Sequence, residues 1–437
     1  MAMIRAQGSR IVVICGDVLL TFCNGVEDQK KLPVKKNAKT QDKDEDTIER
    51  DCPPHGDGKQ KITTPNNCAL AAAFSKSGNY FAVADDFKQL HVYKTGVEYE
   101  LLCTRPIARR GTAVAFPDSE AEVVVADRTG DVYQFSMKET QTDGQLILGH
   151  LSMVLDLCFV GGDEYIVTCD RDEKVRISCY PNSYNIRSYC LYHTEYVSQL
   201  LYLEDRDLLV SGSGDDRLAF WDIDGNLLYD SFESDVQTDT HSEPLGVKRL
   251  VYDAALSTIA VLRFKSTKIQ LYTISGGRDG LSLKQQTLAA DDSLTLGAHE
   301  PWDVCFDGEH NLWVLQACET CPVRAYTCTK LQDSIVVGAG KLGATHQNKL
   351  DSLNSKWELF KGCHECGTPT ISLQKQRTQE NVQKYLERKE ERIHAQKNKP
   401  TLPATQQSTQ QPDQPTKPQT LQPVQQPIQP TKKQKVS

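Results

Sequence analysis

Short apolar runs recur along the chain at a nearly constant interval, each followed by a polar turn and a second, alternating run. The clearest copies end at Tyr93, Phe135, Ser178 and Trp221, which are spaced 42, 43 and 43 residues apart. This interval is typical of the WD repeat, in which roughly 40–45 residues build one four-stranded blade of a β-propeller. The alternation therefore predicts strands, and the interval predicts blades.

Looser copies extend the array to seven blades. Residues 259–272 and 312–326 keep the strand alternation with longer insertions, and residues 10–22 supply strands for one more blade. We therefore expect an all-β fold, a seven-bladed WD-repeat β-propeller over residues 1–340, with the N-terminal strands closing the ring against chain from the 330s. Closure removes exposed sheet edges, which explains why a propeller tolerates variable repeats.

Histidine and aspartate recur at fixed places in the two best repeats. His150 precedes one first strand, and His193 precedes the next one 43 residues further on. Asp172 and Asp215 fall in the turn between the second and third strands, where a carboxylate can accept a hydrogen bond from His150 or His193. Trp221 is expected to pack between neighbouring blades. These residues are predicted to be structural, and the sequence shows no nucleophile–base pair that would make them catalytic.

Three segments fall outside the repeats. Residues 27–66 are rich in mixed charge and are expected to form a flexible loop. Residues 341–399 form a C-terminal extension, in which the stretch from 374 to 399 predicts a basic amphipathic helix. Residues 400–437 form a Gln/Pro-rich tail that is expected to be disordered, because such a composition cannot bury a core. Its basic cluster at 430–436 is of nuclear-import type, with a nonspecific basic tail as the alternative.

Charge is distributed unevenly. The net charge is −8, but residues 374–437 carry twelve Lys/Arg and five Asp/Glu, or +7, which leaves −15 on residues 1–373. An acidic body repels phosphate, so the propeller alone is expected to bind nucleic acid poorly and the basic end to help.

Cellular context follows from what the chain contains. Most of the fifteen cysteines lie in apolar runs and are expected to be buried, reduced thiols. Met1 to Gly16 lack the sustained apolar run of a signal peptide, and no stretch approaches the roughly 20 apolar residues of a membrane span. We expect a soluble intracellular protein without a membrane partner.

Two motif matches lack the context that their chemistry needs. Residues 338–343, Gly-Ala-Gly-Lys-Leu-Gly, spell a dinucleotide fingerprint, but no apolar helical stripe follows them, so an inter-strand loop is expected there. Cys318 with Cys321 and Cys363 with Cys366 have the spacing of zinc ligands. Each pair lacks a second pair at finger distance, and a shared site would require the two pairs to converge in space. No cofactor and no metal are predicted for this chain.

One blade departs from the repeat pattern. Residues 170–176, Asp-Arg-Asp-Glu-Lys-Val-Arg, carry six charges, and Ser178 stands where the other repeats have an aromatic residue. Alternation places Lys174 and Arg176 on one face of the strand and their apolar neighbours on the other. The pattern is equally compatible with a solvated rim and with a docking surface that captures partner carboxylates. Arg176→Glu is expected to leave the fold intact, because the apolar face is unchanged.

This blade and two C-terminal segments resemble one family. Residues 149–153 (Gly-His-Leu-Ser-Met) precede the charged strand, and residues 193–198 (His-Thr-Glu-Tyr-Val-Ser) follow it; residues 356–360 (Lys-Trp-Glu-Leu-Phe) and 381–392 are also similar. Over roughly residues 70–395 the chain resembles the WD-repeat, non-catalytic subunit of the tRNA (guanine-N7)-methyltransferase. The long charged first loop and the Gln-rich tail resemble its Wuho-type member.

The resemblance implies a scaffold that is not itself an enzyme. It implies binding to a catalytic subunit that holds S-adenosylmethionine, and help in placing tRNA for N7 methylation of a variable-loop guanosine. Lys174 and Arg176 match family residues that pair with acids on that subunit. The partner-binding residues implied in full are Arg171, Asp172, Glu173, Lys174 and Arg176. The helix residues implied to lie near tRNA are Lys384, Tyr385, Arg388, Lys389 and Arg392. A nuclear location is expected, with the cytoplasm as a second one.

Two other classes of function remain open. A general WD-repeat protein-interaction adaptor, of chromatin or ubiquitin-ligase type, would bind peptides at the rim of the central channel, whereas the heterodimer needs the charged side strand. A stand-alone enzyme, such as a nuclease, would need a metal-binding carboxylate cluster, which the sequence does not show.

Overall fold

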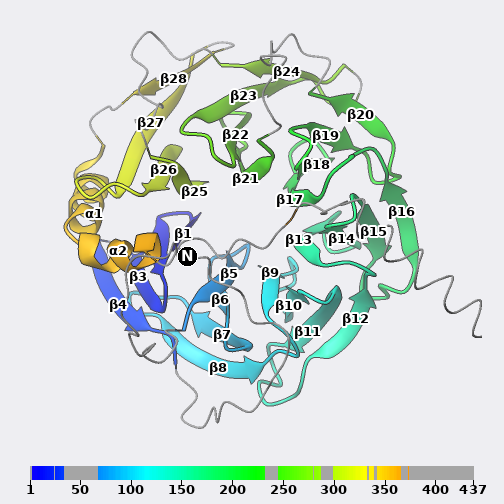
Figure 1. The fold of residues 1–437 in the computed structure, drawn as a ribbon, viewed down its shortest axis with the longest axis horizontal. Coiled ribbons are helices and arrows are strands. Elements are labelled where there is room, and N and C mark those ends of the chain that lie inside the picture. Colours follow the sequence, from blue (N-terminus) through cyan, green and yellow to red (C-terminus); the bar gives the residue numbers. More distant parts are fainter. Residues whose placement is uncertain are drawn as a thin grey trace, which may run out of the picture. The chain divides into compact units, whose positions relative to one another are not determined.

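Strand pairing follows the repeats in the computed structural model, which describes residues 2–23, 25–33, 67–231, 245–278, 280–286, 299–331, 334–338, 342–365 and 373. These residues form seven four-stranded antiparallel sheets, each built from four consecutive strands. The sheets are the blades of a ring, in which the first strand of each blade lies innermost and the fourth outermost (Figure 1). The prediction of a seven-bladed β-propeller is confirmed.

The first three blades come from the N-terminal third of the chain. The first blade contains β1 (Ala2–Gln7), β2 (Arg10–Cys15), β3 (Val18–Cys23) and β4 (Val26–Lys31). The second contains β5 (Ala69–Phe74), β6 (Tyr80–Asp85), β7 (Gln89–Lys94) and β8 (Glu100–Pro106). The third contains β9 (Gly111–Ala115), β10 (Glu122–Asp127), β11 (Asp131–Ser136) and β12 (Gln145–Gly149).

Four further blades complete the ring. The fourth contains β13 (Val154–Val160), β14 (Tyr165–Asp170), β15 (Val175–Cys179) and β16 (Ile186–Cys190). The fifth contains β17 (Val197–Leu203), β18 (Leu208–Ser213), β19 (Leu218–Trp221) and β20 (Leu227–Asp230). The sixth contains β21 (Val247–Asp253), β22 (Thr258–Arg263), β23 (Ile269–Ser275) and β24 (Ser282–Gln285). The seventh contains β25 (Pro301–Phe306), β26 (Asn311–Gln316), β27 (Val323–Leu331) and β28 (Ser334–Gly338).

Apolar side chains fill the space between neighbouring blades. The residues that end the four clearest repeats, Tyr93, Phe135, Ser178 and Trp221, all lie on third strands and are buried. Trp221 packs in one cluster with residues of both the fourth and the fifth blade, among them Val175. Both faces of a middle strand are therefore covered, because each blade is sandwiched between two others.

The ring closes between the first and seventh blades by packing, and the two blades share no sheet. β1 lies beside β25. The backbone N–H of Ile4 donates to Asp303 Oδ2 at 3.0 Å, and the Arg5 guanidinium pairs with the same carboxylate. The expectation that the N-terminal strands close the ring against the 330s is wrong in its location. β28 is the outer strand of the seventh blade, and the contact is made by inner strands.

Two helices cover the junction between these blades (Figure 1). α1 (Ala344–Asn354) and α2 (Trp357–Glu365) follow β28. Leu353 and Phe360 are fully buried in a cluster with residues of both blades. Lys349 Nζ donates to the carbonyl of Ser9 at 3.0 Å, and Lys356 Nζ lies 2.7 Å from Glu27 Oε1. Residues 338–343, expected to form an inter-strand loop, are followed by a helix from residue 344 and not by a strand.

The segment boundaries also need one correction. β4 covers residues 27–31, which were expected in the flexible loop, because this charged segment pairs with β3 as the outer strand of the first blade. Residues 34–66 lie outside the described residues. The chain divides at residue 375, and the expected basic helix within 374–399 and the tail from 400 also lie outside them. None of the helices among the described residues is long and apolar enough to cross a membrane.

Removing the Phe360 side chain should detach the helices from the ring. We expect Phe360→Ala to destabilise the protein by about 3–5 kcal/mol, because a fully buried phenyl ring leaves a cavity. Leu331→Ala is the matched control, since Leu331 is 58% exposed and its truncation should change stability by about 0.5 kcal/mol or less. Denaturant melts of the two variants check this; equal midpoints would mean that α2 does not pack as described.

Candidate partner-binding site

The fifth blade carries a buried hydrogen-bond network that fixes its inner loop. His193 Nδ1 lies 3.0 Å from Asp215 Oδ2, and its Nε2 lies 2.8 Å from Ser211 Oγ. Trp221 Nε1 donates to the same hydroxyl at 2.8 Å. The structure thus shows the His193–Asp215 contact expected from the repeat. Burial raises the pKa of Asp215, but the hydrogen bond and the charge of His193 outweigh it, so the pKa lies below its usual value.

The fourth blade builds the same network with a different aspartate. His150 Nδ1 lies 3.0 Å from Asp170 Oδ2, and the expected hydrogen bond from His150 to Asp172 is wrong. Asp170 Oδ1 also accepts the backbone N–H groups of Asp172 (2.8 Å) and Lys174 (3.1 Å), which holds its carboxylate inside the turn. Asp172 accepts the hydroxyl of Ser152 at 3.0 Å instead. The Asp172 side chain is thereby left at the outside of the blade.

The turn from Arg171 to Lys174 is charged and tightly held. The Arg171 N–H donates to the carbonyl of Met153 at 2.9 Å, which joins the turn to the loop that precedes β13. Glu173 adopts a left-handed conformation, with φ of 74°, a strain of order 1 kcal/mol that the surrounding bonds maintain. Lys174 is exposed, and its Nζ donates to the carbonyl of Asp172 at 3.1 Å. The turn therefore presents charge on a fixed backbone.

Arg176 does not share that exposed surface. It is 8% exposed, and its guanidinium donates to Ser178 Oγ at 2.9 Å and to the carbonyl of Gly149 at 3.0 Å. Burial lowers its pKa. The expectation that Arg176 and Lys174 leave one solvent-facing side is wrong, because β15 is covered on both faces. Ser178 replaces the aromatic residue of the other repeats and accepts a hydrogen bond from this guanidinium.

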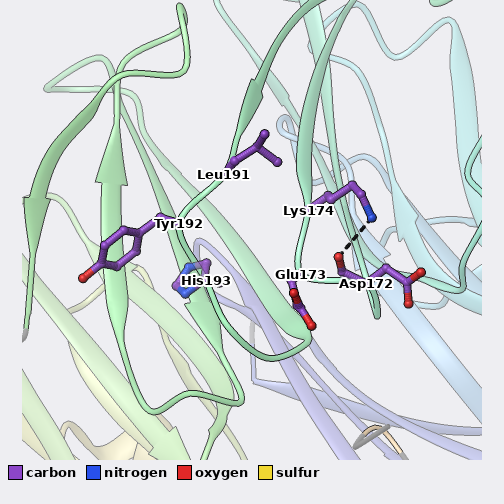
Figure 2. A pocket seen from close by; sticks show the side chains of 6 residues that line it. All are labelled: Asp172, Glu173, Lys174, Leu191, Tyr192 and His193. Atoms are coloured by element: carbon purple, nitrogen blue, oxygen red, sulfur yellow. Dashed lines mark hydrogen bonds between the residues drawn. The ribbon is translucent and has the colours of Figure 1, made fainter. Parts of the chain in front are cut away.

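A hollow of about 390 Å³ lies between the charged turn and the segment that leads to the fifth blade. Figure 2 shows Leu191 between Tyr192 and Lys174. The lining residues are Asp172, Glu173, Lys174, Leu191, Tyr192 and His193. Arg217 Nη1 donates to the Tyr192 hydroxyl at 2.6 Å and its guanidinium lies over the Tyr192 ring, which fixes that side of the hollow.

Two leucines next to the turn project into solvent. Leu191 is 68% exposed, and Leu151, in the loop that Ser152 and Met153 bind to the turn, is fully exposed. Exposed leucines beside a charged, rigid turn are typical of a protein-binding surface, in which apolar residues make the core and charges the rim. We call Leu151, residues 171–174 and residues 191–193 the fourth-blade surface.

The structure also locates the cysteine pairs with zinc-like spacing and the ends of the glycine-rich segment. Cys318 and Cys321 lie in the turn between β26 and β27, whereas Cys363 lies in α2 against Cys15, whose pKa is raised by their hydrogen bond and by burial. The two pairs do not converge through Cys363, and Cys366 lies outside the described residues. Within the described residues, no group of three or more His, Cys, Asp or Glu could hold a metal ion. Gly338 ends an antiparallel outer strand, whereas a dinucleotide site requires a parallel strand that leads into the helix; residues 339–341 lie outside the described residues.

The residues expected near tRNA belong to the C-terminal extension. Five residues of the expected helix lie outside the described residues: Lys384, Tyr385, Arg388, Lys389 and Arg392.

The sequence did not reveal the exposure of Leu151 and Leu191, since nothing in their local pattern separates an exposed leucine from a buried one. It also missed α1, whose buried positions are His346, Lys349 and Leu353. Their spacing of three and four is helical, but two of the three residues are polar.

The fold is that of a WD-repeat propeller, and its fourth blade carries the candidate protein-binding surface. The family model described as "tRNA methyltransferase TRM82 WD40 domain" matches residues 22–145 and 136–293. The chain is 36% identical to the zebrafish (Danio rerio) tRNA (guanine-N(7)-)-methyltransferase non-catalytic subunit wdr4, over 79% of this chain and 81% of that protein. It therefore belongs to the family of non-catalytic subunits of tRNA (guanine-N7)-methyltransferase, and is not the enzyme itself.

Further comparisons agree on the family and on the fold. The human subunit WDR4 is 35% identical over 73% of this chain and 75% of its own length, and the Drosophila melanogaster subunit wuho is 31% identical over 53% and 63%. The solved RRP9 WD40 repeats give a TM-score of 0.52 at 16% identity, covering 71% of this chain and 86% of that chain. A chain of the mitotic checkpoint complex gives 0.52 at 12% identity, covering 72% and 86%. These two likenesses show the fold alone.

Charge reversal should lower the stability of the protein much more at the buried Arg176 than at the exposed Lys174. We expect Arg176→Glu to destabilise the protein by about 3 kcal/mol or more, because it buries a carboxylate among carbonyl oxygens that have lost their donor. Lys174→Glu should change stability by only about 0.5 kcal/mol. Thermal melts of both variants distinguish the two positions; an unchanged midpoint for Arg176→Glu would contradict the burial described.

Substitution of Asp215 and of Asp172 by alanine should also differ in its cost in stability. Asp215→Ala should cost about 1–3 kcal/mol, because it strands the buried His193, whereas Asp172→Ala removes a hydrogen bond at the surface and should cost less. Since the folded pKa of Asp215 is lowered, its contribution is present at neutral pH and is lost on acidification. The difference in the free energy of unfolding between the parent and Asp215→Ala, measured by chemical denaturation, should therefore become smaller below about pH 4. A difference in the free energy of unfolding that stays constant with pH would contradict the lowered pKa of Asp215.

Proposed function

We propose that this chain is the scaffold subunit of a heterodimeric tRNA (guanine-N7)-methyltransferase and that it binds the catalytic subunit through the fourth-blade surface. The observation that carries the proposal is the placement of two exposed leucines beside the charged turn. Family membership supplies the class of partner. S-adenosylmethionine would be held by that partner, and this chain would stabilise it.

The physical basis of the docking is a rigid surface with apolar and charged parts. The turn is fixed by Asp170 and by the loop before β13, so little backbone order would be lost on binding. Leu151 and Leu191 supply apolar area that a partner would cover. Arg171 and Lys174 supply positive charge, which suits carboxylates at the edge of a partner. Arg176 would act indirectly, by holding β15 beneath the turn.

The proposed part played in tRNA placement rests on the basic C-terminal segment. Residues 374–437 carry a net charge of +7, against −15 for residues 1–373. Phosphate binding by an acidic propeller is unfavourable, so the helix residues Lys384, Tyr385, Arg388, Lys389 and Arg392 are the proposed contacts. The basic cluster at 430–436 makes the nucleus the proposed location.

Two substitutions on the fourth-blade surface test the docking. Leu191→Asp should weaken binding of the catalytic subunit by about 30-fold or more, because losing a central apolar contact costs about 2 kcal/mol. Lys174→Glu reverses a charge at the rim and should weaken binding mainly by slowing association, with an effect that shrinks as salt is raised. Leu331→Asp, on an exposed leucine of the seventh blade, is the matched control and should bind like the parent. Titration calorimetry with the purified catalytic subunit measures the affinities, and melts verify the fold.

Two other results of these experiments would contradict the proposal. Folded variants that bind at parental affinity would place the docking site elsewhere on the ring. A general adaptor would instead lose its partner on substitution of residues at the central channel and would leave tRNA methylation by the catalytic subunit unchanged.

A further inference from the structure

Two thiols face one another in the turn that joins β26 and β27. Cys318 Sγ lies 3.5 Å from Cys321 Sγ, and both residues are half-buried, so solvent reaches the pair. The residues between them, Glu319 and Thr320, are exposed. This distance is close to van der Waals contact and needs only a small movement of the turn to reach the S–S bond length of about 2.05 Å.

Polar donors surround the pair. Gln316 Nε2 donates to the carbonyl of Cys321 at 2.7 Å and to its sulfur at 3.3 Å. Arg324 Nη2 lies 3.7 Å from the same sulfur, and the Thr320 hydroxyl lies 3.3 Å from Cys318 Sγ. Donors and a guanidinium stabilise a thiolate, which is the reactive form of cysteine.

The thiol of Cys318 differs from the buried thiols of Cys190 and Cys328. The pKa of Cys318 is lowered, since burial would raise it but hydrogen bonds from Thr320 and Cys321 outweigh burial. Burial raises the pKa of Cys190 and of Cys328 to about 12, which makes those thiols inert. Cys15 and Cys363 also form a pair, and their hydrogen bond lowers the pKa of Cys363 to about 6, but both residues are buried in the cluster where α2 packs on the first blade.

We propose that Cys318 and Cys321 are a reversible dithiol–disulfide site that reacts with a small disulfide such as glutathione disulfide. The Cys318 thiolate attacks one sulfur of glutathione disulfide, forms a mixed disulfide and releases one glutathione thiolate. Cys321 then gives up its proton to solvent, attacks Cys318 Sγ and releases the second glutathione. The two cysteines lose two electrons, which reduce the glutathione disulfide to two glutathione molecules.

The surrounding fold confines the reaction to the turn. The Gln316 N–H donates to the carbonyl of Pro322 at 2.9 Å, and the Val323 N–H donates to Asn354 Oδ1 of α1 at 3.0 Å. These bonds hold the strand ends on both sides of the cysteines. Closing the disulfide therefore shortens the turn without opening the blade.

Differential alkylation of the full-length chain tests this site. The reduced protein is incubated with glutathione disulfide, its free thiols are blocked with iodoacetamide, and its peptides are analysed by mass spectrometry without reduction. We expect Cys318 and Cys321 to escape alkylation together, in a peptide that is two hydrogens lighter than the dithiol form. Excess reduced glutathione should restore both alkylations.

Single substitutions make the test specific. Cys318→Ser and Cys321→Ser should each keep a glutathione adduct on the remaining cysteine, because no resolving thiol is present. Cys179→Ser, which removes a half-buried cysteine of the fourth blade, should leave the loss of the two thiols unchanged. The proposal is wrong if the pair stays fully alkylatable while the single variants form adducts. It is also wrong if protection of the pair is abolished by a chelator, since a bound metal would then explain it.

Discussion

The ring depends on the buried carboxylate of Asp303, which joins its first and seventh blades. It accepts the Ile4 N–H, pairs with Arg5 and lies 3.5 Å from Arg249 Nε. Burial alone would raise the pKa of Asp303, but the two guanidinium groups and the backbone donors outweigh it, so the pKa lies below its usual value. No strand is shared between the two blades. Charged and apolar contacts at this junction, covered by α1 and α2, therefore keep all seven blades in place.

The closed ring holds the proposed partner-binding surface in place. The fourth-blade surface contains turns and loops, which by themselves would be mobile. Asp170, Ser152 and the backbone of Met153 bind the turn to the neighbouring loop, and the blades on either side hold β15. Arg176 belongs to this supporting structure. Under the proposed function, the scaffold contributes a preformed binding surface and the catalytic partner carries out the chemistry.

The repeat interval of 42–43 residues predicted the blades of the four clearest copies, and the alternating runs of the looser copies supplied the rest of the seven, because each blade needs the same four strands and turns. β4 was missed because an outer strand is half solvated and most of its residues are charged, as in a loop: Glu27, Asp28, Lys30 and Lys31. α1 was missed because His346 and Lys349 occupy its buried face. On the candidate site, the six charges of residues 170–176 singled out this segment, but alternation could not reveal that Lys174 lies in a turn and that β15 is covered on both faces. The exposure of Leu151 and Leu191 depends on neighbouring loops, which no local pattern encodes.

Hydrogen exchange of the full-length chain, alone and with the catalytic subunit, tests most directly whether the fourth blade carries the function. The account predicts slower exchange on binding at residues 150–153, 171–174 and 191–193, and unchanged exchange in the corresponding turns of the sixth and seventh blades. Protection confined to the central channel or to the sixth and seventh blades, with the fourth-blade surface exchanging as in the free chain, would contradict it.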